Sequence, residues 1–214
     1  MPEQVTKLKK KQWYPIIAPK QFDNVVLGET LVYEPNQLLG KTLSLSLMNL
    51  MRDTKRQNIS IHFKVFEVDD NKAKASIIGF HIVNSSIKRF VRRNSDKIDA
   101  SFNCETADNV RLRVKPLLIT KNFIKGSIGA KLRYNAASFL SKTIKKITYD
   151  EVINDLISHK LQDTLKASLN KIYPLKVCEV RYAGIEAMEK KEEANAEAKE
   201  KPQEVEVEVK EWFF

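Results

Sequence analysis

The sequence ISIHFKVFEV at residues 59–68, with DDNK at 69–72 and a second apolar stretch over 74–83, decides the fold class. Apolar residues occupy every second position at the start of the first stretch: Ile59, Ile61, Phe63 and Val65. This period of two is typical of a half-buried β-strand. Asp and Asn tolerate the left-handed backbone of tight turns, so residues 69–72 predict the turn of an antiparallel hairpin.

The same alternation recurs on both sides of this hairpin. Residues 42–48 alternate Leu with Ser and Thr, and residues 97–105 and 110–120 form a second predicted strand pair around a turn at 106–109. In the latter strand Arg111, Arg113 and Lys115 alternate with apolar residues, so one face packs inward and the other presents three cations. Residues 175–182 predict a closing strand, and QWYPIIAP at 12–19 is extended or looped because of its prolines.

Helical spacing follows each strand pair. Residues 84–94 predict a short basic helix capped by Asn84 or Ser85, and a longer helix is expected from about residue 130, because Gly126 and Gly129 weaken its first turns. Thr148 and Glu151 form a capping box that opens a further helix, ended by Pro174. The fold class predicted is α+β: a mostly antiparallel, β-barrel-like sheet with flanking helices and a C-terminal helical pair.

Charge divides the chain into unequal parts. Residues 186–214 hold ten Glu and five Lys, whereas residues 1–185 hold 32 basic and 17 acidic residues, a balance of +15. We therefore expect a basic N-terminal arm (1–21), a β-barrel/α core (22–184) and an acidic C-terminal tail (185–214). A body this basic predicts a polyanionic partner.

Two long windows contain no acidic residue. Residues 71–95 hold six Lys or Arg, and residues 109–149 hold ten. Ordinary surfaces intersperse both signs because unpaired like charges repel, so these windows make physical sense if phosphates supply the missing negative charge. The alternative is a solvated basic face.

Catalytic, metal and cofactor sites are not expected. Cys104 and Cys178 have no Cys or His at metal-ligand spacing and read as reduced, buried thiols. His62, His81 and His159 are scattered, and Asp69 and Asp70 belong to a turn. The sequence contains no phosphate-cradling Gly loop or nucleophile elbow. Because these catalytic motifs are missing, we expect no enzyme activity. The sequence also contains neither a secretory signal nor a membrane span, so we expect cytoplasmic residence and no membrane partner.

Six phrases in one order resemble a known family. They are KQWYPIIAPKQF at 11–22, LGETL at 27–31, GK at 40–41, SDKIDA at 95–100, VRLRVKP at 110–116 and IYPLK at 172–176. Together they are similar to the small-subunit ribosomal protein family S three-Ae (eukaryotic-type S one), in its archaeal form. Two features depart from the family: a sparser basic tract at 129–137, and a tail that matches nothing in it.

The resemblance implies a structural protein that binds ribosomal RNA on the platform of the small subunit, near the 3′ end of that RNA and the mRNA exit. Its implied partners are small-subunit ribosomal RNA, neighbouring ribosomal proteins and mRNA near the exit. It also implies a barrel-like core with flanking helices. The alternative function is a free-standing regulator that binds RNA or DNA.

The predicted RNA-binding residues are the arm and window cations with one aromatic: Lys9, Lys10, Lys11, Trp13, Lys88, Arg89, Arg92, Arg93, Arg111, Arg113, Lys115, Lys121 and Lys125. Trp13 either stacks on exposed bases or anchors the arm into the core. In the tail, Val alternates with Glu before a final aromatic cluster, which predicts an added edge strand on another protein through Val205, Val207, Val209, Trp212, Phe213 and Phe214. An acidic guard for the basic body and a disordered solubilising tail remain alternatives.

Overall fold

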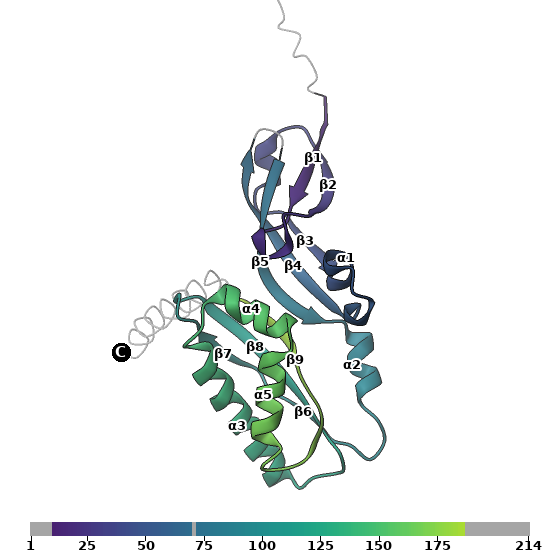
Figure 1. Cartoon of the computed structure of the whole chain (residues 1–214), viewed down its shortest axis with the longest axis vertical. Coiled ribbons are helices and arrows are strands. Elements are labelled where there is room, and N and C mark those ends of the chain that lie inside the picture. Colours follow the sequence, from purple (N-terminus) through teal and green to yellow (C-terminus); the bar gives the residue numbers. More distant parts are fainter. Residues whose placement is uncertain (1–9, 70–71, 187–214) are drawn as a thin grey trace, which may run out of the picture.

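The computed structural model describes residues 10–69 and 72–186. Its described strands form one mostly antiparallel sheet: β1 Gln12–Ile17, β2 Val26–Val32, β3 Thr42–Ser46, β4 Ile59–Asp69, β5 Lys72–Ile82, β6 Lys97–Asp99, β7 Phe102–Glu105, β8 Arg111–Thr120 and β9 Leu175–Ile185. Figure 1 shows an elongated molecule, with β1 to β5 in its upper half and β6 to β9 in its lower half.

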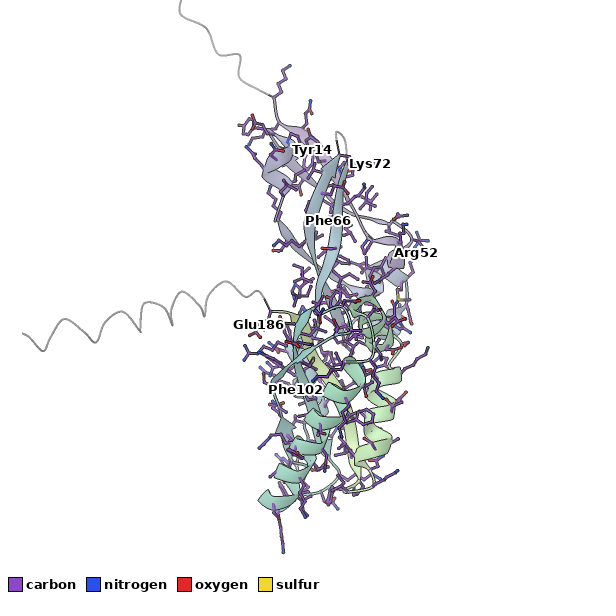
Figure 2. The ribbon with its side chains drawn as sticks, turned by 90° about the vertical axis from the view of Figure 1, so that its left-hand side faces the viewer. Tyr14, Arg52, Phe66, Lys72, Phe102 and Glu186 are labelled. Carbon is purple, nitrogen blue, oxygen red and sulfur yellow. The ribbon has the colours of Figure 1, made fainter. Side chains whose placement is uncertain are left out.

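The predicted hairpin is confirmed as the long β4–β5 pair, which is antiparallel over nearly its whole length. Ile61 and Phe63 of β4 are fully buried, whereas Lys64 and Phe66 on the same strand are exposed. Figure 2 shows Phe66 on the hairpin, with Lys72 near its tip. The alternation therefore builds the core of the upper half from one face of the hairpin and leaves the other face to solvent.

The predicted second strand pair is also confirmed, with one break. Strand β8 pairs with β6 and β7 along one edge and with β9 along the other. Residues 97–105 form two short strands, separated at 100–101, instead of one. Leu112 and Val114 are buried and Arg111 and Arg113 are exposed, as the alternation along β8 predicts.

The two halves of the sheet meet where the end of β5 pairs with β9. Gly79 lies opposite Gly184, Phe80 opposite Ala183 and His81 opposite Tyr182. A Cβ on Gly79 would stand 3.0 Å from the carbonyl oxygen of Ala183, closer than nine in ten real contacts. Glycine at this position therefore permits the close backbone approach that continues the sheet from one half into the other.

Helices and short 3-10 turns connect the strands: η1 Lys20–Phe22, η2 Pro35–Leu38, α1 Leu47–Met51, η3 Thr54–Arg56, α2 Asn84–Phe90, α3 Gly126–Ile144, α4 Tyr149–Ile157 and α5 Lys160–Leu169. Helices α3, α4 and α5 gather in the lower half (Figure 1). The capping box is confirmed at α4, where the Thr148 amide donates to Glu151 Oε2 at 3.2 Å.

Two helix starts differ from the prediction. Val83 stands at the N-cap of α2 with no side-chain cap bond, so Asn84 lies inside the helix. Helix α3 begins at Gly126 because tertiary contacts outweigh the weak glycine propensity. Asp96 accepts the Ile124 amide at 2.8 Å, and buried Gly129 packs against the Ile124 side chain.

The structure does not confirm the barrel. Among the described strands, β2, β3, β6 and β7 each have a partner on one side only, so the sheet stays open. The physical reason lies at β5, where β1 and β9 share the same edge. Strand β1 pairs in parallel near the start of β5 and β9 pairs near its end. The sheet therefore extends lengthwise instead of closing on itself.

The C-terminal helical pair is not confirmed either, because two helices follow α3 where one was predicted. His159, between α4 and α5, adopts a left-handed backbone (φ 62°) that interrupts the helix. The buried Gln162 side chain donates to the Leu156 carbonyl at 3.0 Å and so satisfies an acceptor that the break would leave open. The apolar spacing continues through the break because both helices bury the same side.

The Glu179 carboxylate on β9 is buried in surroundings that disfavour its charged form. Glu179 Oε2 is buried without a hydrogen bond from the described residues, and His159 Nδ1 lies 3.7 Å away. Burial raises the pKa of Glu179 to about 7, and the nearby Asp163 carboxylate acts in the same direction. Burial also lowers the pKa of His159, so the imidazole does not supply a compensating charge near neutral pH.

Replacing this carboxylate is expected to stabilise the fold above neutral pH. The folded state binds the Glu179 proton more tightly than the unfolded state, so the free energy of unfolding falls as pH rises from 4.5 to about 7. Glu179→Gln removes this loss and should raise the free energy of unfolding by about 1–2 kcal/mol near pH 8, with little change near pH 4. Urea denaturation at both pH values measures it. Glu29→Gln, on the exposed edge strand β2, is the control and should leave the pH profile unchanged.

Candidate nucleic-acid interface

The register of the sheet lines up polar side chains in rows across its exposed face. In one row, His62 of β4 faces Gly79 of β5, Gly79 faces Gly184 of β9, Gly184 faces Arg113 of β8, and Arg113 faces Asn103 of β7. Residues directly opposite one another in antiparallel strands lie on the same face. The row therefore crosses five strands and the junction between the two halves.

A second row lies beside the first. Ser60 faces His81, His81 faces Tyr182, and Tyr182 faces Lys115. The Lys115 ammonium lies 5.0 Å from the centroid of the Tyr182 ring, a cation–π contact. The ring itself lies across Gly184, since a Cβ there would stand 2.6 Å from Tyr182 Oη. We call the two rows, extended by Arg111, Glu105 and Arg181, the polar face; Arg181 borders one cavity together with His62, His81 and Lys115.

The opposite side of the same strands is apolar. Ile61, Phe80, Leu112 and Val114 are each at most 2% exposed and alternate with the residues of the polar face. Period-two alternation thus separates a core-facing surface from a charged one within single strands.

Two arginines of the polar face are already partnered by carboxylates. Arg111 Nε lies 3.3 Å from Glu105 Oε1, and Arg113 Nη1 lies 3.5 Å from Glu186 Oε1. Arg113 Nε also donates to Ser101 Oγ at 3.3 Å. Glu105 precedes the acid-free window 109–149 by four residues and Glu186 follows it far along the chain, and folding brings both beside its cations. These pairs are solvent-exposed, so each stabilises the fold by only about 0–1 kcal/mol and can exchange for another anion.

Lys115 and Arg181 are placed differently. Neither has an ion pair among the described residues, and Arg181 donates to Asn84 Oδ1 at 3.5 Å. Lys115 faces Tyr182 while Pro116 faces Val180, so Arg181 is the extra residue of a β-bulge. Two adjoining cavities, of about 360 and 230 Å³, both border Lys115 and Arg181. Asp99, which borders the larger cavity, is paired with Lys97 at 2.6 Å.

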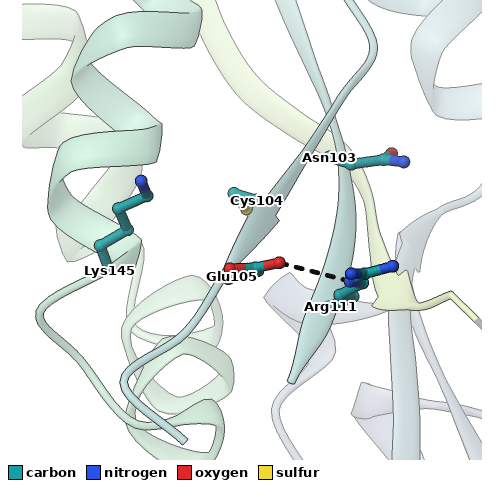
Figure 3. A pocket seen from close by; sticks show the side chains of 5 residues that line it. All are labelled: Asn103, Cys104, Glu105, Arg111 and Lys145. Carbon is teal, nitrogen blue, oxygen red and sulfur yellow. Dashed lines mark hydrogen bonds and ion pairs between the residues drawn. The ribbon is translucent and has the colours of Figure 1, made fainter. Parts of the chain in front are cut away.

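A third cavity, of about 320 Å³, lies at the β7 edge of the sheet. Figure 3 shows its Glu105–Arg111 pair, with Lys145, the C-cap residue of α3, across the pocket from them and Cys104 between. Burial raises the pKa of the Cys104 thiol to about 11, so it remains protonated near neutral pH. The Cys178 thiol behaves alike, with a pKa of about 12. Neither is an activated nucleophile, which agrees with the prediction of inert buried thiols.

Comparison with known protein families identifies the family of this chain. A model of the ribosomal S3Ae family matches residues 2–187, which is most of the chain. The chain belongs to this family.

Archaeal members of the ribosomal S3Ae family are similar over most of their length. The small ribosomal subunit protein eS1 of Sulfurisphaera tokodaii is 33% identical over 81% of this chain and 90% of its own. That of Nanoarchaeum equitans is 31% identical over 85% and 92%, and that of Haloarcula marismortui is 29% identical over 83% and 84%. The resemblance stated from the sequence is confirmed.

Membership of the ribosomal S3Ae family gives the chain a structural role in the ribosome and in translation. It is not an enzyme, as the sequence analysis predicted. Among the helices that the structure describes, none combines the length and apolarity required to cross a bilayer.

Apart from Lys121 and Lys125, the predicted RNA-binding residues that the structure describes fall into three groups, and one of them lies on the polar face. Arg111, Arg113 and Lys115 belong to it. Lys121 follows β8, and Lys125 precedes α3 as its N-cap. At roughly 3.3 Å per residue, Lys121 lies about 30 Å from Arg111 along the strand. These two are exposed but belong to the far end of the lower half.

The second group surrounds α2. Lys88 and Arg89 are in the last turn of this helix, and Arg92 and Arg93 follow it, all exposed. Arg89 donates to Asn58 Oδ1 at 3.2 Å and to Ser86 Oγ at 3.0 Å, so its guanidinium also ties α2 to the β3–β4 connection.

The third group is at the N-terminal end. Lys10 and Lys11 are exposed, and Lys11 lies 5.0 Å from the Tyr33 ring centroid. Trp13 is 64% exposed on β1, whereas the neighbouring Tyr14 is buried, so Tyr14 anchors this strand. Lys9 and the six residues predicted for protein docking, Val205, Val207, Val209, Trp212, Phe213 and Phe214, lie outside the described residues.

Four residues of the interface were missed by the sequence analysis: Arg181, Tyr182, His62 and His81. The two histidines were read as scattered, yet their rings stack with centroids 4.4 Å apart and planes 17° apart. The alternation of β4 does put His62 on the polar side. No local sequence pattern predicts the bulge at Arg181 or the pairing that joins β5 to β9.

The junction between the halves provides a stability test of this geometry. Gly79→Ala forces a methyl group against the Ala183 carbonyl and should lower the free energy of unfolding by about 1–3 kcal/mol. Gly28→Ala, whose added Cβ meets nothing within 4 Å, is the matched control and should be neutral or slightly stabilising. Chemical denaturation compares them. Equal stability of the two variants would contradict the close approach of β5 and β9.

Proposed function

We propose that this protein is a structural component of the small ribosomal subunit that binds small-subunit ribosomal RNA through the polar face of its sheet. The polar face contributes Arg111, Arg113, Lys115 and Arg181. The flanking cations after α2 and after β8 extend the contact along the molecule. RNA phosphates act as the counterions of this surface.

A single observation carries the proposal: the cross-strand register gathers cations on one exposed sheet face that also bears aromatic and amide side chains. Cations beside aromatic and amide groups suit RNA, whose phosphates and unstacked bases both need partners. The exposed Glu105 and Glu186 pairs keep the arginines extended before binding and yield to phosphates, because a surface ion pair is weak.

The position within the subunit is part of the proposal and is supported by the family resemblance. It is the platform, near the 3′ end of the ribosomal RNA and the mRNA exit. Neighbouring ribosomal proteins and mRNA near the exit are the further partners, and the ribosome in the cytoplasm is the location. The chain acts as a basic N-terminal arm (1–21), an RNA-binding core (22–184) and an acidic tail (185–214), with β1 joining the arm to the sheet.

Removing the β8 cations should weaken RNA binding and its dependence on salt. For Arg111→Gln/Arg113→Gln/Lys115→Gln, the slope of log affinity against log salt should fall by about two to three units, up to one per lost phosphate contact. The matched control is Lys20→Gln/Lys160→Gln/Lys171→Gln, which removes the same charge from exposed positions away from the polar face. Filter binding to a small-subunit ribosomal RNA fragment over a salt series measures both.

Equal losses in the two triple variants would contradict a role for the polar face, since net charge alone would then explain binding. Sedimentation of the tagged protein tests the ribosomal role itself. Stoichiometric migration with the small subunit is expected, whereas migration free of ribosomes would favour the regulator. Within residues 10–69 and 72–186 no feature favours that alternative, and α2 spans only Asn84–Phe90, short for a recognition helix.

The acidic tail is proposed to dock on a neighbouring protein through its alternating valines and terminal aromatics, Val205, Val207, Val209, Trp212, Phe213 and Phe214. Deletion of residues 205–214 should abolish crosslinks to that neighbour while leaving ribosomal RNA affinity unchanged. If the deletion instead strengthens RNA binding, the tail acts as an acidic guard. Unchanged incorporation and unchanged crosslinks would contradict docking.

A further inference from the structure

The stacked histidines border a cavity next to the unpaired cations of the polar face. His62 and His81 line the cavity of about 230 Å³ together with Asn84, Lys115, Arg181 and Tyr182. Two of these residues come from the upper half of the sheet, two from β9, one from β8 and one from α2. The cavity exists only because the β5–β9 pairing brings the two halves together.

The cavity offers two kinds of contact side by side. On one side the two imidazole rings form a parallel stack, with centroids 4.4 Å apart. On the other, Lys115 and Arg181 have no carboxylate partner among the described residues, and the adjoining cavity of about 360 Å³ is bordered by the same two cations and by Arg113. An anion held between the two cavities would lie beside a flat aromatic surface.

The electrostatics of His81 favour an aromatic ligand over a second anion. Burial lowers the pKa of His81, and the neighbouring His62 lowers it further, so the His81 ring is neutral near neutral pH. Its Nδ1 is buried without a hydrogen bond from the described residues. A neutral ring stacks through its face and does not compete with Lys115 and Arg181 for phosphate.

The rim of the cavity adds a further ring and a polar group. The Tyr182 ring lies across Gly184 and lines the same cavity as the two histidines. Asn84 Oδ1 accepts from Arg181, which leaves the amide NH₂ of Asn84 as a donor at the rim. Proteins hold an unstacked nucleotide with an aromatic stacking surface, an amide donor and neighbouring cations, and this cavity offers all three.

We propose that this cavity holds one unpaired RNA nucleotide, with its base stacked on the His62–His81 pair and its phosphate between Lys115 and Arg181. The inference rests on the proposed RNA-binding function and adds a preference for unpaired bases to it. The remaining cations of the polar face bind the RNA phosphate backbone whatever its bases are.

The test separates base stacking from charge. Binding of an oligoadenylate is compared with binding of an abasic ribose-phosphate oligomer of equal length and charge, by fluorescence anisotropy with the full chain. The wild type should prefer oligoadenylate by about tenfold, the size expected of one base stacked on an aromatic side chain. His62→Ala should remove the preference, and His62→Phe, which keeps a ring, should retain it. Tyr134→Ala, which removes an exposed ring on α3 outside the polar face, is the matched control and should behave as wild type.

The outcomes distinguish the two proposals. If the wild type binds both oligomers equally, or if His62→Ala keeps the preference, the nucleotide site is wrong while RNA binding by charge stands. If neither oligomer binds the wild type, both proposals are overturned. Thermal denaturation of His62→Ala checks that the variant is folded. Lys115→Gln provides a second test: it should lower the affinity for both oligomers without changing the ratio of the two affinities.

Discussion

The short antiparallel pairing of β5 with β9 is the constraint on which the rest of this structure depends. It joins two strand systems whose sequences lie far apart, and it does so through glycines at 79 and 184 that face each other. Because backbone approaches backbone there without an intervening Cβ, the sheet continues from the upper half into the lower half. The polar rows and the cavity of about 230 Å³ cross this junction, and the histidine stack lies beside it.

The interface owes its charge to a simple alternation and its detail to tertiary contacts. Over residues 111–115 of β8, every second residue is a cation and the intervening residues fill the core. Folding then returns Glu105 and Glu186 to this row, so the acid-free window is not acid-free in space. Weak, exposed ion pairs suit a surface that must exchange its partner for phosphate, whereas buried pairs would hold the arginines in place.

Membership of the ribosomal S3Ae family agrees with this surface chemistry. The structure offers an extended sheet face with distributed cations, and both thiols are protonated and buried. Such a surface agrees with the proposed binding of RNA phosphates. The lengthwise, open sheet also suits a structural protein, because it spreads contacts over a long surface instead of gathering them at a pocket.

The sequence by itself determined the antiparallel hairpin, the cationic face of β8, the capping box at Thr148, the basic character of the body and the family. These features depend on local periodicity or on residue identity, both of which are visible along the chain. Tertiary structure alone decided that the sheet stays open, that the third helical segment breaks at His159, and that α3 starts at Gly126. It also decided which candidates assemble. The bulge at Arg181 lies in the pairing of β8 with β9, and the β5–β9 pairing, across more than a hundred residues, brings Arg181 and Lys115 beside the His62–His81 stack of the hairpin. The physical reason is that strand register and edge sharing at β5 are set by packing between distant segments, which no local pattern encodes.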